Sequence, residues 1–390
     1  MEGIRQSPLL ELQLIATGAH LSPEFGLTYR DIEADGFCID RRVEMLLSSD
    51  TPVGVTKSLG LGLLGFADAL AELRPELLLI LGDRYEIFAA AAAAMVTRIP
   101  IAHLHGGETT EGAIDEAIRH AITKLAHLHF VGAEDYRRRV IQLGEAPDRV
   151  FLVGGLGVDN ILKLKLLDRA ALEAALDFRL GPSNLLVTFH PVTLETGTAA
   201  DQMAELLAAL ETLTDTHLIF TLPNADTEGR GLMRQIQAFV DRHPQRAKAF
   251  ASLGQLRYLS AVAQVDAVVG NSSSGLAEVP TFKKPTINIG DRQRGRLRAA
   301  SVIDCAPDRG AILAALREMA SPRFQDRLAT SVNPYGNGGA SEAIVATLEA
   351  LAAQPFNQLL KKRFQDMDLT SIQTAVASTP TPTPSCDQLV

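Results

Sequence analysis

Cysteine is scarce in this sequence and is never closely spaced. The 390 residues include three cysteines, Cys38, Cys305 and Cys386, and no CxxC pair. This spacing excludes a disulfide framework and a zinc module built on paired cysteines, and it is typical of a protein in a reducing compartment. We therefore expect a cytoplasmic protein without a metal site.

Long apolar runs are also missing. No segment approaches the ~18 uninterrupted apolar residues of a membrane span. Residues 1–18, MEGIRQSPLLELQLIATG, lack the basic-then-apolar order of a signal peptide, because Glu11 interrupts the apolar run. The sequence therefore predicts neither a membrane span nor a membrane partner.

Positive charge is in deficit. The chain has 37 Lys and Arg against 46 Asp and Glu, a formal net charge of −9 at pH 7. This balance argues against nucleic acid and anionic lipid as partners, but it is compatible with a locally basic pocket for an anionic small molecule. With 46% hydrophobic and 21% charged residues, the composition is that of a globular protein, and 390 residues are enough for two domains.

Three common nucleotide-binding or catalytic loops are absent. No GxxxxGK[ST] P-loop occurs, so ATP-driven chemistry is not expected. The segment GGLGVDN (154–160) lacks the third glycine of the dinucleotide fingerprint and is better explained as an interdomain turn. The segment GNSSSG (270–275) does not have the GxSxG spacing of a serine-hydrolase elbow. We expect no bound cofactor.

What the sequence does contain is a regular alternation of apolar strands with helical patterns. One series of strand candidates precedes residue 160, and a second follows a charged helical stretch at 160–178. The candidates are LELQLIAT, ELLLILG, IPIAHLH, HLHFVG and RVFLVGG, then NLLVTFHP, THLIFTLP, AKAFASL, AVVGNSSS and PTINIGD. Such alternation indicates parallel sheets covered by helices on both faces. The predicted fold is α/β, with two Rossmann-like doubly wound domains facing a cleft.

The same pattern predicts where the domains begin and end. We expect an N-terminal domain at 1–160, a second domain at 161–354, and a tail at 355–390. The tail includes the repeat STPTPTP, which cannot build a core, so it is predicted to be disordered.

The segment HLHGGETTEGAIDEAIRH (103–120) concentrates histidines and carboxylates after a strand. His103, His105 and Glu108 are of metal-ligand type, but in an extended chain the two histidines point the same way while the Gly-Gly turn redirects Glu108. This geometry counts against a metal site and leaves acid–base chemistry as the other interpretation of the segment. Asp115 opens the following helix, where it could pair with Arg119 one turn on.

A second group of loops has the composition of a phosphate site. The hydroxyls of Ser272, Ser273 and Ser274, followed by a helix start, could bind phosphate oxygens, or the serines could simply cap the helix. The nearby GDRQRGR (290–296) favours phosphate, because diphosphate prefers bidentate cations and this segment supplies Arg292, Arg294 and Arg296. Glu278 could hold ribose hydroxyls or lie solvated near the helix start.

Several motifs in order resemble the hydrolysing UDP-N-acetylglucosamine 2-epimerases of bacterial sialic-acid pathways. They are GDRYEIF, HLHGGETTEGAIDEAIRHAITK, RVIQLGE, FHPVTL, NADT, GNSSSGLAEVP and INIGDRQRGRLRAASVID, and they span roughly residues 10 to 350. The resemblance implies two Rossmann-like domains in the glycosyltransferase-B arrangement and a homo-oligomer, dimer or tetramer. It also implies a reaction that needs no cofactor: UDP is eliminated to give a 2-acetamidoglucal, whose hydration yields N-acetylmannosamine.

The resemblance also implies roles for individual residues. Asp83 corresponds to a catalytic acid, Arg84 to a substrate contact, Asp115 to a second catalytic carboxylate and His190 to a histidine beside the diphosphate. The nucleotide contacts correspond to Asn224, Ser272, Ser273, Glu278 and Arg292. Each has a plainer alternative: Asp83 could cap a helix, and His190 could be a packed histidine before Pro191.

Two departures from the family pattern carry expectations of their own. Some relatives have glutamate where this chain has His105, so we expect His105 or Glu108 to take that role. The family begins with a strand and a TGTRADYG-like turn, whereas this sequence begins after that point, so we expect the chain as given to be poorly soluble or inactive. Two alternatives stay open: a hydrolysing 2-epimerase of UDP-N,N′-diacetylbacillosamine in a legionaminic-acid pathway, and a nucleotide-sugar-binding protein without turnover.

Overall fold

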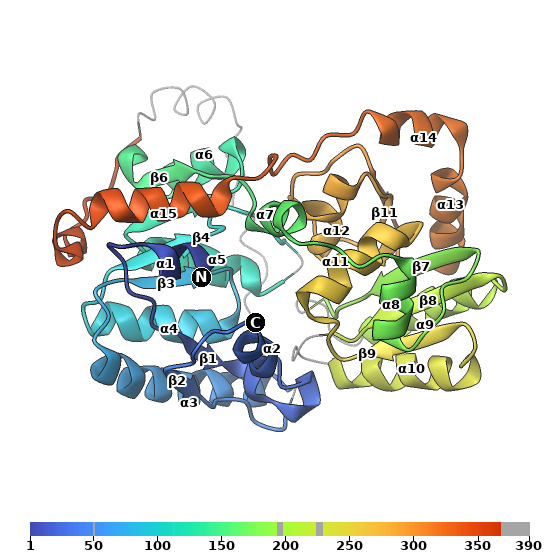
Figure 1. The fold of residues 1–390 in the computed structure, drawn as a ribbon, viewed down its shortest axis with the longest axis horizontal. Helices are drawn as coiled ribbons and strands as arrows, with labels where there is room; N and C mark the ends of the chain where they lie inside the picture. The colour runs from blue at the N-terminus through green and yellow to red at the C-terminus, as the bar shows by residue number, and fades with distance from the viewer. Residues whose placement is uncertain (50, 112, 193–197, 224–228, 368–390) are drawn as a thin grey trace, which may run out of the picture.

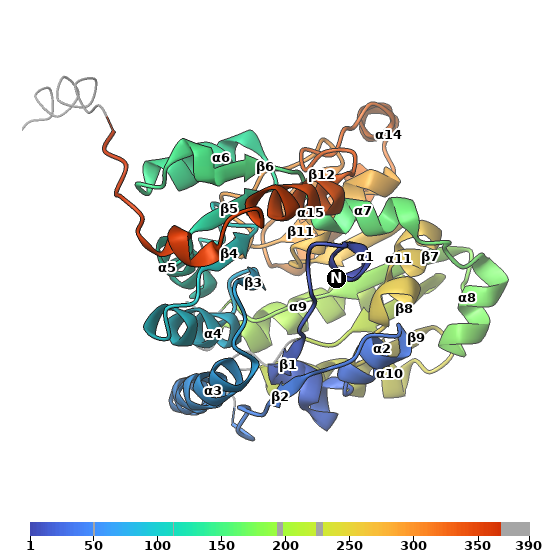
Figure 2. The same ribbon diagram turned by 60° about the vertical axis from the view of Figure 1, so that its left-hand side comes forward.

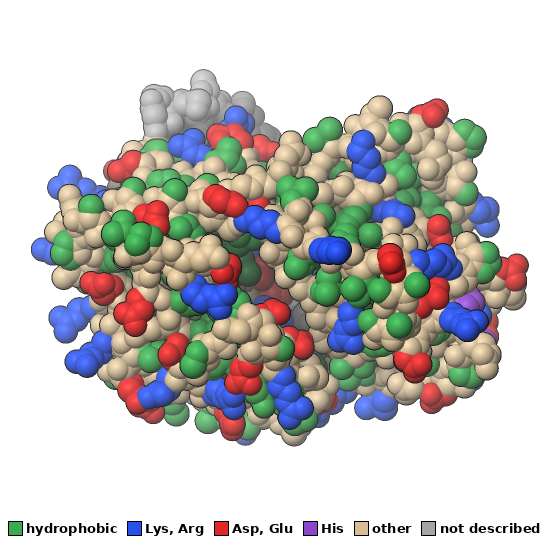
Figure 3. Space-filling view, viewed as in Figure 1, with side chains coloured by type: hydrophobic (Ala, Val, Ile, Leu, Met, Phe, Trp, Pro, Cys, Tyr) green, Lys and Arg blue, Asp and Glu red, His purple; other side chains and the backbone are tan. Residues whose placement is uncertain are grey.

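The fold consists of two α/β lobes with a hollow between them (Figures 1 and 3). The structure is a computed structural model that describes residues 1–49, 51–111, 113–192, 198–223 and 229–367. Every strand pair in the described residues is parallel. The predicted α/β class with two Rossmann-like halves is therefore confirmed.

The N-terminal lobe is centred on a four-stranded parallel sheet. Its strand order is β3 (Leu78–Leu81), β4 (Ile101–Leu104), β5 (Leu128–Val131) and β6 (Val150–Leu152). Every residue of β4 and β5 is buried, because helices cover both faces of these strands. This explains why these strands appear in the sequence as apolar runs in which histidine is the one polar residue.

One face of this sheet is covered by helices with small side chains. Helix α4 (Tyr85–Val96) contains a run of alanines, most of them buried between the sheet and α3 (Pro52–Leu73). Helix α3 is long and apolar enough to cross a membrane by length and composition alone. Its buried side chains Phe66 and Leu70 belong to the core cluster around α4, whereas Leu61, Leu63 and Leu64 on the same helix are exposed.

Two short strands lie apart from the central sheet. Strands β1 (Ile15–Thr17) and β2 (Arg41–Val43) pair with each other in a separate two-stranded sheet. The predicted first strand, LELQLIAT, is thus shorter than expected, and β2 was not predicted. The remaining elements of this lobe are α1 (Glu2–Gln6), α2 (Tyr29–Ala34), α5 (Asp115–Leu125), α6 (Glu134–Gln142), and the 3₁₀ turns η1 (Gly18–Leu21), η2 (Pro23–Phe25) and η3 (Pro147–Arg149).

The C-terminal lobe contains a six-stranded parallel sheet. Its order is β12 (Val302–Cys305), β11 (Thr286–Ile289), β10 (Ala267–Gly270), β7 (Ser183–Thr188), β8 (Thr216–Thr221) and β9 (Ala247–Phe250). From β7 the chain adds β8 and β9 on one side of the sheet, and then β10, β11 and β12 on the other side, so the switch point lies between β7 and β10. In doubly wound sheets a ligand binds at this switch point, beyond the carboxyl ends of the strands.

Helices cover both faces of this second sheet as well. They are α8 (Arg169–Leu176), α9 (Ala199–Glu211), α10 (Gly229–Arg242), α11 (Gly254–Gln264), α12 (Ser274–Ala277), α13 (Arg309–Met319) and α14 (Pro322–Ala329), with the 3₁₀ turn η4 (Val279–Phe282). Two apolar clusters result, one on each face of the sheet.

The chain passes between the lobes twice. Helix α7 (Leu156–Lys163) makes the first crossing and begins inside GGLGVDN, which was predicted as a turn. The second crossing returns to the N-terminal lobe, where α15 (Ala340–Leu351) covers the other face of β4 and β5 (Figures 1 and 2). The domain limits at 160 and 354 stay predictions, but α15, predicted in the second domain, packs with the first sheet because Ile344 and Leu348 bury against it.

The first part of the predicted disordered tail is also packed on the N-terminal lobe. Phe356 is buried in η5 (Phe356–Leu360). Lys362 Nζ donates to both carboxylate oxygens of Glu145 at 2.9 Å, and the Phe364 ring lies against Gly144. Residues 356–367 therefore differ from the prediction, because one cation and two aromatic rings find partners there. The Thr-Pro repeat lies outside the described residues.

Candidate active site

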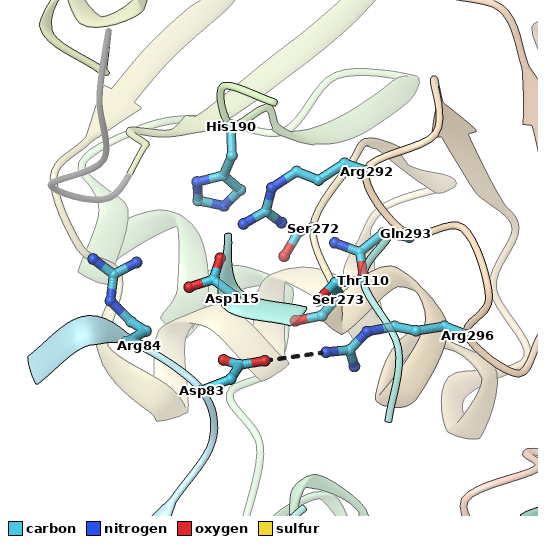
Figure 4. Close-up of a pocket in the computed structure, with 10 residues that line it drawn as sticks. All are labelled: Asp83, Arg84, Thr110, Asp115, His190, Ser272, Ser273, Arg292, Gln293 and Arg296. Atoms are coloured by element: carbon cyan, nitrogen blue, oxygen red, sulfur yellow. Dashed lines mark ion pairs between the residues drawn. The ribbon is translucent and has the colours of Figure 1, made fainter. Parts of the chain in front are cut away.

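A polar pocket lies in the hollow between the two lobes (Figures 3 and 4). Ten residues line it, and they come from loops at the carboxyl ends of strands in both sheets. They are Asp83, Arg84, Thr110, Asp115, His190, Ser272, Ser273, Arg292, Gln293 and Arg296. The pocket thus brings together seven of the predicted site residues from segments as far apart as 83 and 292.

Asp83 reaches the pocket through a tight turn after β3. Gly82 has φ of +86°, a conformation that favours glycine, so the chain reverses immediately after the strand. His103 on the neighbouring strand β4 stabilises this turn, because its Nε2–H donates to the Gly82 carbonyl at 2.8 Å. Burial lowers the pKa of His103 to about 4, so this histidine is neutral and structural.

Arg119 holds the acidic side of the pocket together. This guanidinium is fully buried and forms an ion pair with Asp83 and another with Glu116 at 2.6 Å. It also donates to the Thr110 hydroxyl at 2.6 Å and to the Glu108 carbonyl at 3.0 Å. Asp83 is therefore an ion-pair partner, which differs from the helix-cap alternative, and a single arginine orients several loop groups at once.

His105 and Glu108 form a second pair beside this cluster. His105 Nδ1 and Glu108 Oε1 are 2.6 Å apart, and Glu108 Oε2 lies 2.5 Å from Arg296 Nη1 of the opposite lobe. Burial opposes ionisation of Glu108, yet Arg296 and His105 lower its pKa to about 2. Glu108 is therefore a carboxylate at neutral pH.

The expectation that His103 and His105 point the same way is wrong. His105 has φ of +65°, which takes it out of the extended conformation of β4. Its ring consequently turns to Glu108, whereas His103 faces Gly82 and Thr123 in the core. Within the described part of the chain, no group of three or more His, Cys, Asp or Glu side chains is arranged to hold a metal ion.

On the C-terminal side, Asn271 organises the loops that follow three strands. Its side chain accepts from the His190 backbone N–H at 2.7 Å and donates to the His190 carbonyl at 2.8 Å. Its own carbonyl accepts from Arg292 at 3.2 Å and from Gln293 at 2.8 Å. This arrangement requires Gly270, because a side chain there would collide with the Thr188 carbonyl of β7. The ends of β7, β10 and β11 are thereby locked together.

The serine-rich loop divides between the pocket and the lobe interior. Ser272 and Ser273 line the pocket, but Ser274 does not. Ser274 accepts from the Tyr258 hydroxyl at 2.6 Å and donates to Glu278. Burial raises the pKa of Glu278, although the hydrogen bond from Ser274 acts in the opposite direction. Ser274 and Glu278 are thus bonded to each other beside the pocket rather than lining it.

Several site residues were not among the predicted set. Thr110, Gln293 and Arg296 line the pocket, and Arg119 and Asn271 orient its walls. The sequence indicated Arg296 as one of three arginines in GDRQRGR, but it did not predict the ion pair that Arg296 forms with Glu108 of the other lobe. The predicted contact Asn224 lies outside the described residues.

The arrangement separates two kinds of chemistry. Among the described residues, the lining carboxylates are Asp83 and Asp115, and both come from the N-terminal lobe. Arg292, His190 and two serine hydroxyls come from the C-terminal lobe, where cations and hydroxyls suit phosphate oxygens. A ligand spanning the pocket would therefore place an anionic group on one wall and a reacting group near carboxylates on the other.

Comparisons with known proteins identify the family of this chain. Residues 2–349 match the family described as UDP-N-acetylglucosamine 2-epimerase. The chain belongs to this family. A "GDP/UDP-N,N'-diacetylbacillosamine 2-epimerase (hydrolyzing)" of Campylobacter jejuni is 46% identical over 295 residues, covering 76% of this chain and 77% of the relative. A "Polysialic acid biosynthesis protein P7" of Escherichia coli is 39% identical over 333 residues, covering 85% of this chain and 84% of the relative.

Solved structures show the same fold at low sequence identity. The crystal structure of a UDP-GlcNAc 2-epimerase from Neisseria meningitidis bound to UDP-GlcNAc superposes with a TM-score of 0.74 at 18% identity. It covers 88% of this chain and 93% of that chain. The chain therefore belongs to a family described as epimerases of a UDP-sugar.

Proposed function

We propose that this protein is a hydrolysing UDP-N-acetylglucosamine 2-epimerase that releases UDP and N-acetylmannosamine. The proposal rests on the pocket. Asp83 and Asp115 of the N-terminal lobe line the same cavity as Arg292, Ser272 and Ser273 of the C-terminal lobe. The carboxylates of the N-terminal wall can transfer protons on a sugar, and the cation and hydroxyls of the C-terminal wall can bind a nucleoside diphosphate.

The chemistry explains why both walls are needed. The hydrogen at sugar C2 is not acidic, so the proposed route removes it while the C1–oxygen bond to the diphosphate breaks. The electron pair of the C2–H bond then forms the C1=C2 double bond, and UDP leaves with the electron pair of the C1–oxygen bond. Water next adds its oxygen to C1 and a proton reaches C2 from the other face, which gives the manno configuration. Arg292 and His190 stabilise the charge that develops on UDP.

A second candidate substrate is UDP-N,N′-diacetylbacillosamine. The support is the similarity to the Campylobacter jejuni relative and to a "UDP-N,N'-diacetylbacillosamine 2-epimerase (hydrolyzing)" of Legionella pneumophila, which is 34% identical over 363 residues, covering 93% of each chain. The two substrates differ at sugar C4 and C6. We place the polysialic or sialic-acid pathway first because of the sequence motifs and the similarity to protein P7.

An NMR assay separates these candidates. The purified chain is incubated with each UDP-sugar, and the released UDP and free sugar are followed in time. Release of N-acetylmannosamine from UDP-N-acetylglucosamine supports the first proposal, and release only from the bacillosamine sugar supports the second. Binding of UDP-sugar without release would contradict both and would favour a binding protein without turnover.

A further inference from the structure

The contact between the two lobes differs at its two ends. One end lies where the chain crosses between the lobes, through α7 and through the segment before α15 (Figure 1). There the lobes share an apolar cluster, in which Tyr335 and the partly buried Leu297 pack with Tyr136 of α6. The Tyr136 hydroxyl accepts from the Leu297 N–H at 3.1 Å and lies 2.8 Å from the Tyr335 hydroxyl. Separating the lobes at this end would expose buried apolar surface, which is unfavourable.

The other end is built from charged and small residues. Glu24 of η2 in the N-terminal lobe forms a bidentate ion pair with Arg230 of α10 in the C-terminal lobe. Arg230 Nε lies 2.8 Å from Glu24 Oε1, Nη2 lies 2.9 Å from Oε2, and Nη1 donates to the Ser48 carbonyl at 2.9 Å. The Arg230 and Glu24 side chains are 32% and 35% exposed. The lobes also approach closely beside this pair, because a side chain at Gly26 would contact Ala251. Water can therefore reach the groups that join the lobes here.

The pocket lies between these two ends. In Figures 1 and 3, which share one view, α7 lies above the hollow, and α2, which follows Glu24 in the chain, lies below it. Figure 2 shows α2 beside α10. Two-domain proteins open and close around ligands by rotation about a hinge, and the displacement grows with distance from the hinge. With the chain crossings as the hinge, the contact between Glu24 and Arg230 is far from the axis and is strongly displaced by opening.

We infer that Glu24 and Arg230 form a latch, an ion pair that holds the lobes together over the pocket and separates when a nucleotide enters or leaves. The inference rests on the proposed function in taking UDP as the ligand. A partly exposed ion pair shifts an equilibrium by only about 1.5–5-fold, so this latch is weak enough to open repeatedly. The ion pair of Arg296 with Glu108 also joins the lobes, but Arg296 directly precedes Leu297 and belongs to the hinge end.

The test measures how fast UDP leaves the protein. Excess UDP displaces bound N-methylanthraniloyl-UDP in a stopped-flow experiment, which gives the dissociation rate constant. Glu24→Gln and Arg230→Met should each raise this constant by about 1.5–5-fold. Glu24→Arg combined with Arg230→Glu should bring it back toward the wild-type value, because the reversed pair can form again. The ratio of each single variant to the wild type should fall toward one between about 0.05 M and about 0.5 M salt, since salt screens exposed charges.

Arg242→Met is the matched control. Arg242 lies on the same helix, α10, but its carboxylate partner at 3.8 Å is Glu211 of the same lobe, so this variant should release UDP at the wild-type rate. Dissociation rate constants of Glu24→Gln and Arg230→Met equal to that of the control would overturn the inference. Two raised constants that the reversed pair does not correct would also overturn it, because the two residues would then act independently.

A second measurement does not depend on UDP. If the wild-type protein binds no UDP, the proposed function fails, and small-angle scattering of the ligand-free protein decides on the latch. The radius of gyration of Glu24→Arg should then exceed that of the wild type and of Arg242→Met, because two arginines face each other across the lobes. Equal values would overturn the inference. Should Arg230→Met not fold, Glu24→Gln and Glu24→Arg give the same comparison from the other side of the pair.

Discussion

The two walls of the pocket handle charge in opposite ways. On the N-terminal wall, carboxylates are surrounded by cations: Asp83 and Glu116 share Arg119, and Glu108 pairs with Arg296. On the C-terminal wall, none of the lining residues that the structure describes is a carboxylate, and Arg292, Gln293, His190 and serine hydroxyls surround the cavity.

This difference extends to the ionisation of glutamates in each lobe. Ion pairs and hydrogen bonds lower the pKa values of Glu108, Glu116 and Glu145 to about 2 despite their burial. In the C-terminal lobe, burial raises the pKa of Glu278. The N-terminal lobe therefore holds ionised acids in fixed positions, whereas the C-terminal wall of the pocket presents arginine and hydroxyl groups. Arg296 is the connection, because the C-terminal lobe supplies it to an acid of the N-terminal lobe.

The largest expected effect is on turnover, from removing an acid of the N-terminal wall. Asp83→Asn and Asp115→Asn should each lower kcat by ~10²–10⁴-fold, because general acid–base groups contribute on this scale. UDP affinity, measured by calorimetry, should change little, since both residues lie across the cavity from Arg292 and the serines. Turnover close to the wild-type value in both variants would contradict the assignment of this wall to chemistry.

A smaller effect, on stability, is expected from removing the cation that holds this wall. Arg119→Met should lower the free energy of unfolding by about 3 kcal/mol, because it leaves Asp83 and Glu116 without their buried partner. Chemical denaturation measures the loss, with Arg294→Met, an exposed arginine of the β11–β12 loop, as the control. Equal stability of the two variants would show that the carboxylates do not depend on Arg119.

Mutations in the C-terminal wall should change the UDP dissociation constant more than kcat. Arg292→Ala should raise the UDP dissociation constant by ~10–100-fold, the value of a lost charge-assisted hydrogen bond. Ser273→Ala should raise it less, since a neutral hydroxyl contributes less. Calorimetry gives the affinity, and kcat at saturating UDP-sugar should fall by a smaller factor. A larger loss in kcat than in affinity would reverse the roles of the two walls.

The smallest effects are in the pH dependence of stability. Glu145 has its pKa lowered to about 2 in the folded state, so its contribution is present above ~4.5, the ordinary pKa of the unfolded chain, and is lost as pH falls toward 2. Glu145→Gln should therefore be destabilised at neutral pH and should show a flatter decline of stability between these values. Thermal unfolding at a series of pH values measures this.

Glu278→Gln in the other lobe should behave in the opposite way. The raised pKa means that the ionised form is disfavoured in the folded state, and this cost appears as pH rises through the folded-state pKa. The variant should match or exceed the wild-type melting temperature at neutral pH, and the difference should disappear in acid. A destabilised Glu278→Gln at neutral pH would contradict the contrast between the lobes.

Local patterns in the sequence were sufficient for the strands and for most of the pocket. Runs such as IPIAHLH and NLLVTFHP correspond to β4 and β7, because strands buried on both faces must be apolar throughout. Polar residues that directly follow such strands meet at one edge of a parallel sheet, so Asp83, His190 and Ser272 could be placed together before their positions were known. Strands β2 and β12 were missed because they are only three and four residues long and contain charged residues, so neither forms an apolar run.

Contacts between distant segments could not be predicted in the same way. The amphipathic pattern of α15 predicts that one face of the helix is buried, but it does not specify which of the two sheets that face packs against. The structure shows that it packs against the N-terminal sheet. The turn of His105 toward Glu108 depends on a left-handed backbone angle that nothing in HLHGGE requires.

The sequence by itself determined the α/β class, the order of the strands along the chain and the residue types of the site, because periodicity and composition are local properties. Only the tertiary structure decided that Arg119 holds Asp83 and Glu116, that Arg296 crosses to Glu108, and that Asn271 joins the ends of three strands. The physical reason is that a buried charge must find its partner wherever the fold brings one within reach, and that partner is set by packing across the whole molecule rather than by neighbours in the chain.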